Sequence, residues 1–352
     1  MSELQIGLLS IGILLVVAVY LYGFWQQRSY RRKFGSPTKS PHENALYKSN
    51  SAAADALLNE EVSALGLHEP QRPSNIDEIN TLINAETDYV VNIKLKAPLS
   101  TEVLAPLWEQ RFDFGKNVNA CGLNAASGRW ERLIPESVHA YNEFKFGLQL
   151  ADRSGSVSEI RLMNFHDVLR NVGEQIHVEV ELPSVVNALK QAKSLDEFCA
   201  DVDQMIGLNI LPSGDCLLFG SEIALVAEGR GMQLQSDGSF HLLNEQGRTV
   251  FSLGNLDNSP FQHHTLTQVR VKGLTLLLDV PRVERPAIRF DEMAVLAREL
   301  AIELRAGLVD DHRVSLGEAS IAQIRDQVAS IERRMLAGKI TPGSVQALRL
   351  FA

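Results

Sequence analysis

The chain has 352 residues and a formal net charge of −9 at pH 7, which argues against a nucleic-acid-binding protein. Its three cysteines, Cys121, Cys199 and Cys216, show no paired spacing. The cysteines therefore indicate neither a disulfide framework nor a zinc site, and they suit a reducing compartment. We expect no metal, no cofactor and no nucleic-acid partner.

The N-terminal stretch from Leu4 to Gln27 contains no charged side chain. As a helix it would reach about 36 Å, more than the roughly 30 Å of a bilayer's hydrocarbon core. A cleaved signal would begin with basic residues and end in small ones, whereas bulky Phe24 and Trp25 stand near the end of this run. The sequence therefore predicts a permanent transmembrane helix at residues 5–26, with residues 1–4 outside.

Positive charge follows the apolar run and predicts the orientation of the chain. Cationic loops stay on the cytoplasmic side, and aromatic rings gather at the headgroup level. The bulk of the chain is therefore predicted to be cytoplasmic, with an external N-terminus. The predicted membrane-interface residues are Trp25, Arg28, Arg31, Arg32 and Lys33.

Residues 27–87 are predicted to form a basic juxtamembrane segment and a linker. This region mixes small, polar and charged residues without a sustained apolar period, although short helices would fit at 52–65 and 76–84. The remaining chain exceeds one typical domain, which favours two. We assign a first module to residues 88–202, a second module to 203–340 and a tail to 341–352.

Three pairs of similar segments occur in the same order in both halves and predict a duplicated module. The pairs are 88–95 with 203–210, 178–185 with 276–283, and 194–198 with 289–293. Ser194 with Glu197, and Ser315 with Glu318, have the spacing of capping boxes and predict helix starts.

In the second half, apolar periodicity predicts four strands and three helices. The strands are 204–211, 239–243, 249–253 and 274–280, and the helices are 221–228, 291–305 and 316–336. Strands and helices in this order favour an α+β fold, with an open antiparallel sheet covered by helices on one face.

The face of each sheet that the helices leave free distinguishes the two halves. In the first half it is predicted to be polar and solvated. In the second half, Met205, Gly207 and Asn209 alternate with inward apolar residues, as do Thr275 and Leu277. Small and apolar residues on a free face suit a docking surface, but they also fit the ordinary scatter of apolar residues on a protein surface.

The sequence contains little that predicts catalysis. His263 and His264 lack a carboxylate or cysteine at metal-ligand spacing, and Gly229–Gly231 fits a helix end better than a phosphate loop. Cys199 and Cys216 are predicted to be buried fillers. Asp310–Asp311 fits a turn or strand end better than a carboxylate pair. We therefore predict no catalytic residue and no enzyme.

The second half, together with the N-terminal helix, resembles the ZipA family of bacterial cell division proteins. The similar segments are MIGLNI (205–210), FSLGNL (251–256), GLTLLLDVP (273–281), RFDEMAVLARELAIEL (289–304) and GLVDDHRVSL (307–316). Their order and spacing carry the resemblance more than any single segment does.

The resemblance implies two ferredoxin-like, split β-α-β modules and a single-pass protein of the inner membrane with a periplasmic N-terminus. It also implies that the chain tethers FtsZ filaments at the division site by binding the FtsZ C-terminal peptide, with the bilayer and other division proteins as further partners. The peptide-binding positions that it implies are Met205, Gly207, Leu256, Thr275, Leu277 and Arg313.

The chain departs from the family in two ways. Its linker of about fifty residues would span on the order of 40 Å, which is short for the family. The first module has no counterpart in the familiar form. An alternative prediction is therefore a bitopic scaffold of a secretion or pilus machine that dimerises through its modules.

Overall fold

The computed structural model describes residues 82–214 and 216–352. The predicted transmembrane helix at 5–26, the interface residues and most of the linker lie outside these residues. Within the described residues, no helix combines the length and apolar character needed to cross a membrane.

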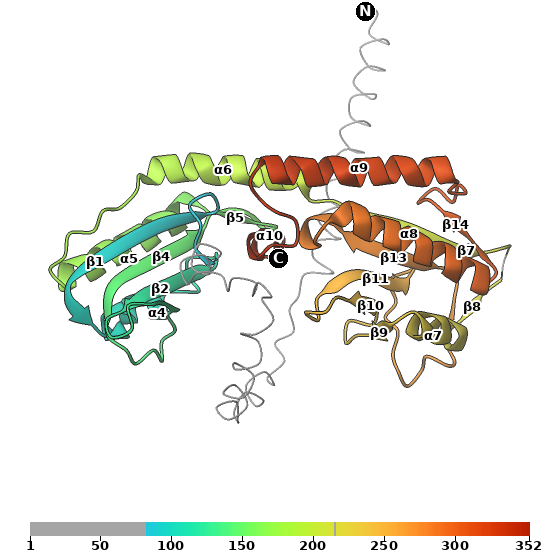
Figure 1. Ribbon diagram of the computed structural model, residues 1–352, viewed down its shortest axis with the longest axis horizontal. Helices are drawn as coiled ribbons and strands as arrows, with labels where there is room; N and C mark the ends of the chain where they lie inside the picture. The colour runs from blue at the N-terminus through green and yellow to red at the C-terminus, as the bar shows by residue number, and fades with distance from the viewer. Residues whose placement is uncertain (1–81, 215) are drawn as a thin grey trace, which may run out of the picture. The chain divides into compact units, whose positions relative to one another are not determined.

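The first module is a four-stranded antiparallel sheet with helices on one face (Figure 1). The order of its strands across the sheet is β1-β4-β2-β3. The strands are β1 (Asp88–Leu99), β2 (Val118–Asn124), β3 (Trp130–Arg132) and β4 (Tyr141–Gln149), followed by the short pair β5 (Ala151–Asp152) and β6 (Gly155–Ser156). The helices are η1 (Thr101–Leu104), α4 (Ala105–Glu109), α5 (Glu159–Gln175) and α6 (Val185–Val202).

Aromatic side chains fill the space between this sheet and α5. Tyr89 on β1 and Phe165 on α5 meet edge to face, with ring centroids 6.2 Å apart, and Phe114 packs against Phe165 at 5.2 Å. Such edge-to-face pairs are favourable beyond the area that they bury. The alternation predicted for β1 is confirmed, since Tyr89, Val91 and Ile93 are buried while Asn92 and Lys94 are exposed.

The second module has a six-stranded antiparallel sheet with the order β14-β7-β13-β11-β10-β9. Its strands are β7 (Met205–Pro212), β9 (Met232–Leu234), β10 (Phe240–Leu243), β11 (Thr249–Asn255), β13 (Leu274–Asp279) and β14 (Ala306–Val309), with β8 (Leu218–Phe219) and β12 (Arg270–Val271) as a separate pair. Its helices are α7 (Gly220–Gly229), η2 (Val280–Arg282), α8 (Pro286–Glu303), α9 (Glu318–Ala337) and α10 (Val345–Leu350).

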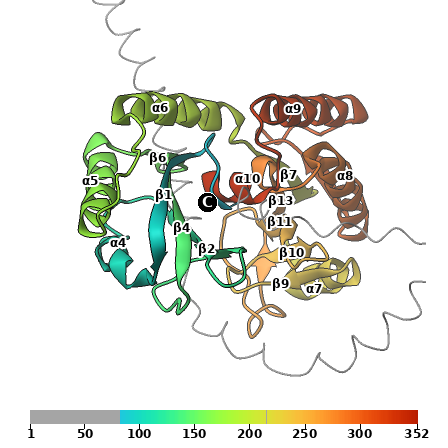
Figure 2. The ribbon, with the colours of Figure 1, turned by 60° about the vertical axis from the view of Figure 1, so that its left-hand side comes forward.

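Helix α8 packs on one face of this sheet and α9 packs beside α8 (Figure 2). Leu274, Leu276 and Leu278 of β13 point to that face and are fully buried. On the opposite face, which we call the open face, the described residues form no covering helix layer of this kind. Thr275 and Leu277 lie on it and are half-buried. The predicted strands and the alternation of faces are therefore confirmed for the second module.

Both helix starts predicted from capping boxes are wrong. Ser194 lies in the middle of α6, whose real N-cap is Ser184, and the Ser184 hydroxyl accepts a hydrogen bond from the Asn187 amide. Ser315 forms an isolated bridge to Val309, and α9 begins later, at Glu318, after Gly317. Capping-box spacing recurs inside and beside helices, so spacing alone does not mark the first turn.

The pairing of repeats is also wrong in one place. Residues 178–185 were matched to β13, but they form no strand: they meet β1 through a bridge from Glu181 to Asn92 and a hydrogen bond from the Tyr89 hydroxyl to the Pro183 carbonyl at 2.6 Å. That edge position, next to the module's first strand, is the one that β14 holds beside β7. The central strand of the first module, equivalent to β13, is β4.

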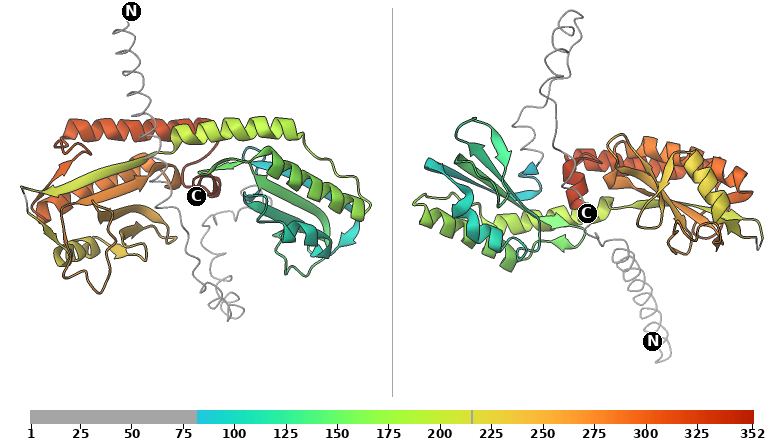
Figure 3. Two further views of the ribbon diagram at one scale, coloured as in Figure 1. Left: turned by 180° about the vertical axis from the view of Figure 1, so that it is seen from behind. Right: turned by 90° about the horizontal axis from the view of Figure 1, so that it is seen from below.

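The two modules are joined through an arginine with two carboxylate partners. Arg153, in the turn between β5 and β6, donates to Asp203 at 2.7 Å and to Asp279 at the end of β13 at 2.8 Å. Both modules belong to one compact unit, Ser74–Ala352. Helices α6 and α9 meet end to end, where Arg334 pairs with Asp201 (Figure 3).

The open face of the first module was predicted to be polar and well solvated, which holds at the exposed Asn92 and Lys94 but is wrong around Cys121. Ile83 and Cys121 are buried there, and they form a small apolar cluster separate from the main core, with Leu82, Val90 and Trp130 packed against it. Segment 82–84, which precedes the module in the chain, covers this part of the sheet.

The two faces of β13 predict a sharp contrast between neighbouring leucines. Leu276→Ala removes a fully buried side chain and should lower the free energy of unfolding by about 2–5 kcal/mol. Leu277→Ala, on the open face, should cost much less because its side chain already meets water. Urea denaturation of both variants measures the difference, and equal losses would contradict the assignment of faces.

Asp279 predicts a pH-dependent term in stability. Burial is the largest cause that raises the pKa of its carboxyl, and the Arg153 guanidinium opposes the shift only in part. A carboxyl with a raised pKa binds its proton more tightly in the folded state, so stability falls as the pH rises from the unfolded pKa through the folded one.

Urea denaturation at several pH values tests this term against Asp279→Asn, which cannot titrate. We expect the stability of wild type relative to this variant to fall as the pH rises from about 4 toward neutrality. A flat difference, or one that rises with pH, would contradict the burial argument.

Candidate functional site

Four of the six predicted binding residues lie side by side on the open face of the second module. Gly207 stands opposite Leu277 across β7 and β13, and Met205 stands opposite Asp279. A Cβ atom added to Gly207 would lie 3.6 Å from both Leu277 Cδ2 and Thr275 Cγ2. The structure thus brings Met205, Gly207, Thr275 and Leu277 together, with Gly207 as a shallow point between two apolar walls.

Strand β11 continues this shallow floor with small residues. Ser252 pairs with Leu277, and Gly254 pairs with Thr275. A Cβ atom at Gly254 would meet only Ser239, at 4.0 Å. The absence of large side chains on both sides of Leu277 leaves its apolar surface accessible from the solvent side of the sheet.

Leu256 lies just beyond the end of β11, where its amide donates to the Gly273 carbonyl at 3.1 Å. A Cβ atom at Gly273 would come within 3.1 Å of Leu256 Cδ2 and 2.4 Å of Leu211 Cδ2. Leu256 and Leu211 therefore meet over Gly273, next to Thr275. Sequence reasoning missed Leu211, although it continues the outward alternation from Gly207 and Asn209 along β7.

Arg313 lies in the turn after β14, exposed and with a left-handed φ of 63°. Asp310 holds this turn, since its carboxylate accepts hydrogen bonds from the His312 and Val314 amides at 2.8 Å each. The Asp310–Asp311 pair is thus part of a turn, as predicted. The sequence did not show that this turn is attached to the sheet.

That attachment runs through Asn209, a buried residue on β7. Its side-chain amide donates to Asp311 Oδ1 at 3.0 Å, and its carbonyl oxygen accepts from the Thr275 hydroxyl at 2.8 Å. The network positions the turn that carries Arg313 at the edge of the open face. A cation at an apolar face favours a ligand with both apolar and acidic groups.

Met205 occupies the opposite end of the face, where its side chain is 47% exposed. Asp279, its partner across the strands, is engaged by Arg153 of the first module. The first module therefore bounds the open face at this end, while the Leu256 end remains free of it. Any extended ligand on Leu277 meets a charged junction on one side and apolar leucines on the other.

His241 lies at the centre of a small polar cluster on this face, where it pairs with Ser252 of β11. Ser239 and Asp237 both meet His241 Nε2, at 2.8 and 2.9 Å, while Thr249 meets Nδ1. Ser239 therefore cannot form a catalytic triad with Asp237 through this ring, because a triad places the acid and the nucleophile on different ring nitrogens. Burial raises the pKa of the Asp237 carboxyl, but hydrogen bonds from His241 and Ser239 outweigh it, so the pKa is lowered overall.

The cysteines and the glycine-rich turn that the sequence analysis discussed can also be placed in the structure. Among the described residues, no cluster of histidine, cysteine and carboxylate side chains is arranged to hold a metal ion. Cys199 is buried in α6 as predicted, whereas the prediction that Cys216 is buried is wrong, since it is exposed. Gly231, with φ 79°, follows the end of α7 as a helix cap would.

Residues 204–327 match the family model described as the ZipA C-terminal FtsZ-binding domain. The matched range runs from the start of β7 into α9 and contains all six predicted binding residues. The resemblance to the ZipA family predicted from the sequence is confirmed for this part of the chain.

Curated relatives agree with this match. The proteins called "Cell division protein ZipA" from Xanthomonas axonopodis pv. citri and Xylella fastidiosa (strain 9a5c) are each 23% identical, over 40% and 46% of this chain and 60% and 65% of their own lengths. The protein of that name from Azotobacter vinelandii is 29% identical over 31% of this chain and 40% of its own length. The chain thus spans less than two thirds of the relatives that it matches.

Asn209→Ala should loosen the turn that carries Arg313. The variant removes the hydrogen bonds to the half-buried Thr275 hydroxyl and the exposed Asp311 carboxylate, each of which contributes about 0.5–1.5 kcal/mol net. Hydrogen exchange followed by mass spectrometry should show faster exchange in 309–314, with α9 unchanged. Unaltered exchange in the turn would contradict its dependence on Asn209.

Proposed function

We propose that this chain tethers FtsZ filaments to the inner membrane at the division site, by binding the FtsZ C-terminal peptide on the open face of the second module. Two observations together support the proposal. The matched family is described as FtsZ-binding, and four of the residues that the resemblance implies, Met205, Gly207, Thr275 and Leu277, lie side by side on a sheet face that α8 and α9 leave uncovered.

The chemistry of the patch supports a peptide that presents apolar side chains from one side. Gly207 and Gly254 leave room beside Leu277, and Leu256 with Leu211 provides a second apolar contact. An amphipathic helix uses this kind of shallow apolar surface, placing residues three and four apart on it. Arg313 at the edge favours acidic residues in the same peptide.

The expected binding free energy of one peptide on one copy of the open face is small. Each apolar side chain contributes about 1.5–3 kcal/mol when fully buried, and four or five such contacts must exceed the several kcal/mol that association costs. A dissociation constant in the micromolar range follows. A filament presents many peptides to many anchored copies, so avidity gives durable attachment while individual contacts exchange.

The membrane half of the proposal rests on the sequence. The apolar run at 5–26 and the cations that follow it favour a single-pass anchor, with Trp25, Arg28, Arg31, Arg32 and Lys33 at the interface. We further propose that the two modules are diverged copies of one split β-α-β plan. Their first strands, β1 and β7, pair in the same way with β4 and β13.

Fluorescence anisotropy with a labelled FtsZ C-terminal peptide tests the proposed site. We expect micromolar binding to wild type and at least about tenfold weaker binding to Leu277→Glu, because a carboxylate on the apolar floor repels an acidic ligand and resists desolvation. The matched control is Leu225→Glu on α7, where the leucine is 75% exposed and away from the open face.

Three outcomes would overturn the assignment. They are no binding at several hundred micromolar peptide, undiminished binding by Leu277→Glu, and equal loss in the Leu225→Glu control. Sedimentation of the detergent-solubilised chain addresses the scaffold alternative, which requires a concentration-dependent dimer that Leu277→Glu disrupts.

A fluorescent fusion that fails to collect at midcell would count against the tether.

A further inference from the structure

The two open faces differ in what covers them. On the first module, Ile83 is only 1% exposed, and it lies against the sheet on the side away from α5. A Cβ atom at Gly147 of β4 would lie 2.8 Å from Ile83 Cγ2. Gly147 has Val90 and Asn119 as its register partners. The glycine thus admits an apolar side chain closely against the sheet, in a setting similar to Gly207 beside Leu277.

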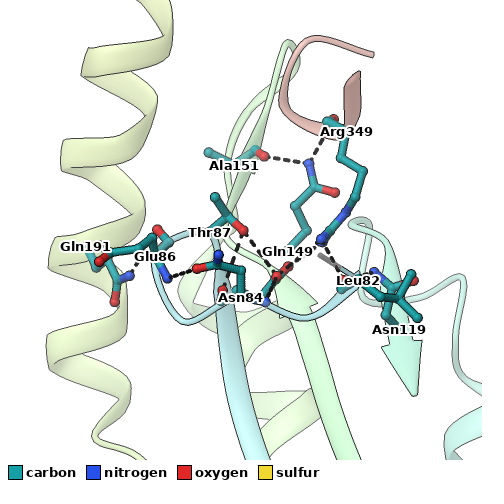
Figure 4. A network of polar contacts seen from close by, with 10 residues as sticks. Leu82, Asn84, Glu86, Thr87, Asn119, Gln149, Ala151, Gln191 and Arg349 are labelled. Atoms are coloured by element: carbon teal, nitrogen blue, oxygen red, sulfur yellow. Dashed lines mark hydrogen bonds and ion pairs between the residues drawn. The ribbon is translucent and has the colours of Figure 1, made fainter. Parts of the chain in front are cut away.

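The backbone of segment 82–84 is held by side chains from both modules, as Figure 4 shows. The Leu82 carbonyl accepts hydrogen bonds from Asn119 Nδ2 at 3.2 Å and from Arg349 Nη1 at 2.8 Å. Asn119 belongs to β2 of the first module, whereas Arg349 belongs to α10 near the C-terminus. The Asn84 amide donates to Asp88 Oδ2, which also pairs with Arg349.

Residues 85 and 86, which follow this segment, make further contacts with the second module and with α6. Lys339 pairs with Glu86 at 2.8 Å, and Gln191 of α6 donates to the Ala85 and Glu86 carbonyls at 2.6 and 3.2 Å. In return, Gln149 Nε2 donates to the Arg349 carbonyl at 3.0 Å. An apolar pair followed by acidic residues is therefore seated on the sheet and paired with cations at its rim.

These contacts allow segment 82–84 to detach from the sheet while the rest of the module stays folded. Segment 82–84 contributes no strand to the sheet, and its apolar cluster is distinct from the main core. Side-chain contacts hold its Leu82 carbonyl, and its Asn84 carbonyl accepts from the nearby Thr87 and Asp88 amides, so undocking of Leu82 and Ile83 breaks no hydrogen bond between the described strands. A segment of this type opens at a lower free energy than global unfolding does.

We propose that the open face of the first module is an internal docking site whose ligand is segment 82–84 of the same chain, and that Arg349 couples its occupancy to the seating of α10. The first module then receives the end of the linker, and the second module is left to receive a partner in trans. If the linker leads to a membrane anchor, a pull on it is delivered to both modules through Leu82 and Arg349.

Cys121 provides a native probe of docking. It lies on β2 under Ile83 with no exposed surface, and burial raises the pKa of its thiol to about 11. Undocking removes that burial and leaves Lys145 and Arg132, whose positive charges lower the thiol pKa. Both changes increase its reaction rate with a thiol reagent. Cys199, buried in α6, reports global unfolding instead.

The experiment uses the full-length chain with Cys216→Ser, so that only the two buried thiols remain. Ellman's reagent is added, and peptide mass spectrometry follows each site. We expect Ile83→Asp to accelerate Cys121 by at least about tenfold while Cys199 stays slow. The matched control is Ile160→Asp on α5, where the isoleucine is 73% exposed, and it should change neither rate.

Arg349→Met tests the coupling between segment 82–84 and α10. It also replaces Ile83→Asp as the test of docking if that variant does not fold. It keeps the apolar stem but removes the bonds to Leu82 and Asp88, so Cys121 should again react faster than Cys199. Conversely, Ile83→Asp should speed removal of the buried Phe351 by a carboxypeptidase. Unchanged Cys121 reactivity in both variants, or parallel acceleration of Cys199, would overturn the docking site. Unchanged release of Phe351 would overturn the coupling.

Discussion

The structure depends on one constraint, that an antiparallel sheet has two faces and helices cover only one of them in each module. Strand side chains alternate between the two faces of the sheet, so each residue that points into the core is followed by one that points to the uncovered face. In the first module, Ile83 from the preceding segment lies over Gly147 on the face that the helices leave free. The second module keeps its open face shallow with Gly207 and Gly254.

Sequence reasoning succeeded where the face of a strand decides the pattern. The alternation around Leu276 predicted both the buried side of β13 and the outward-facing, half-buried position of Leu277, and the alternation at 205–209 predicted that Gly207 faces outward. Local signals failed in two other places. Ser194 looks like a helix start but sits inside α6, because Ser184 provides the N-cap of the helix that begins at Val185. Residues 178–182 have strand-like alternation yet contribute a single bridge.

The parts of the candidate site that sequence could not reveal are those made by distant residues. Asn209 joins Thr275 to Asp311 across a large sequence separation, and no pattern within β7 indicates that its outward polar side chain positions the turn of Arg313. The same holds for Ile83, whose short segment has no strand or repeat signal. A polar first-half face was a sound inference from Lys94 and Asn92, but it could not include a segment from outside the module.

Two arginines make the two modules interdependent. Arg153 ties the first module to Asp279 on the open face, and Arg349 ties the C-terminal helix to Asp88 and Leu82. Both arginines have partly or wholly buried carboxylate partners, and removing one partner of such a pair leaves a charge that is costly to keep unpaired. The ion pairs of Arg334 with Asp201 and of Lys339 with Glu86 add to the junction. The boundary of the open face at Asp279 and the segment at Leu82 are therefore held by the same compact unit.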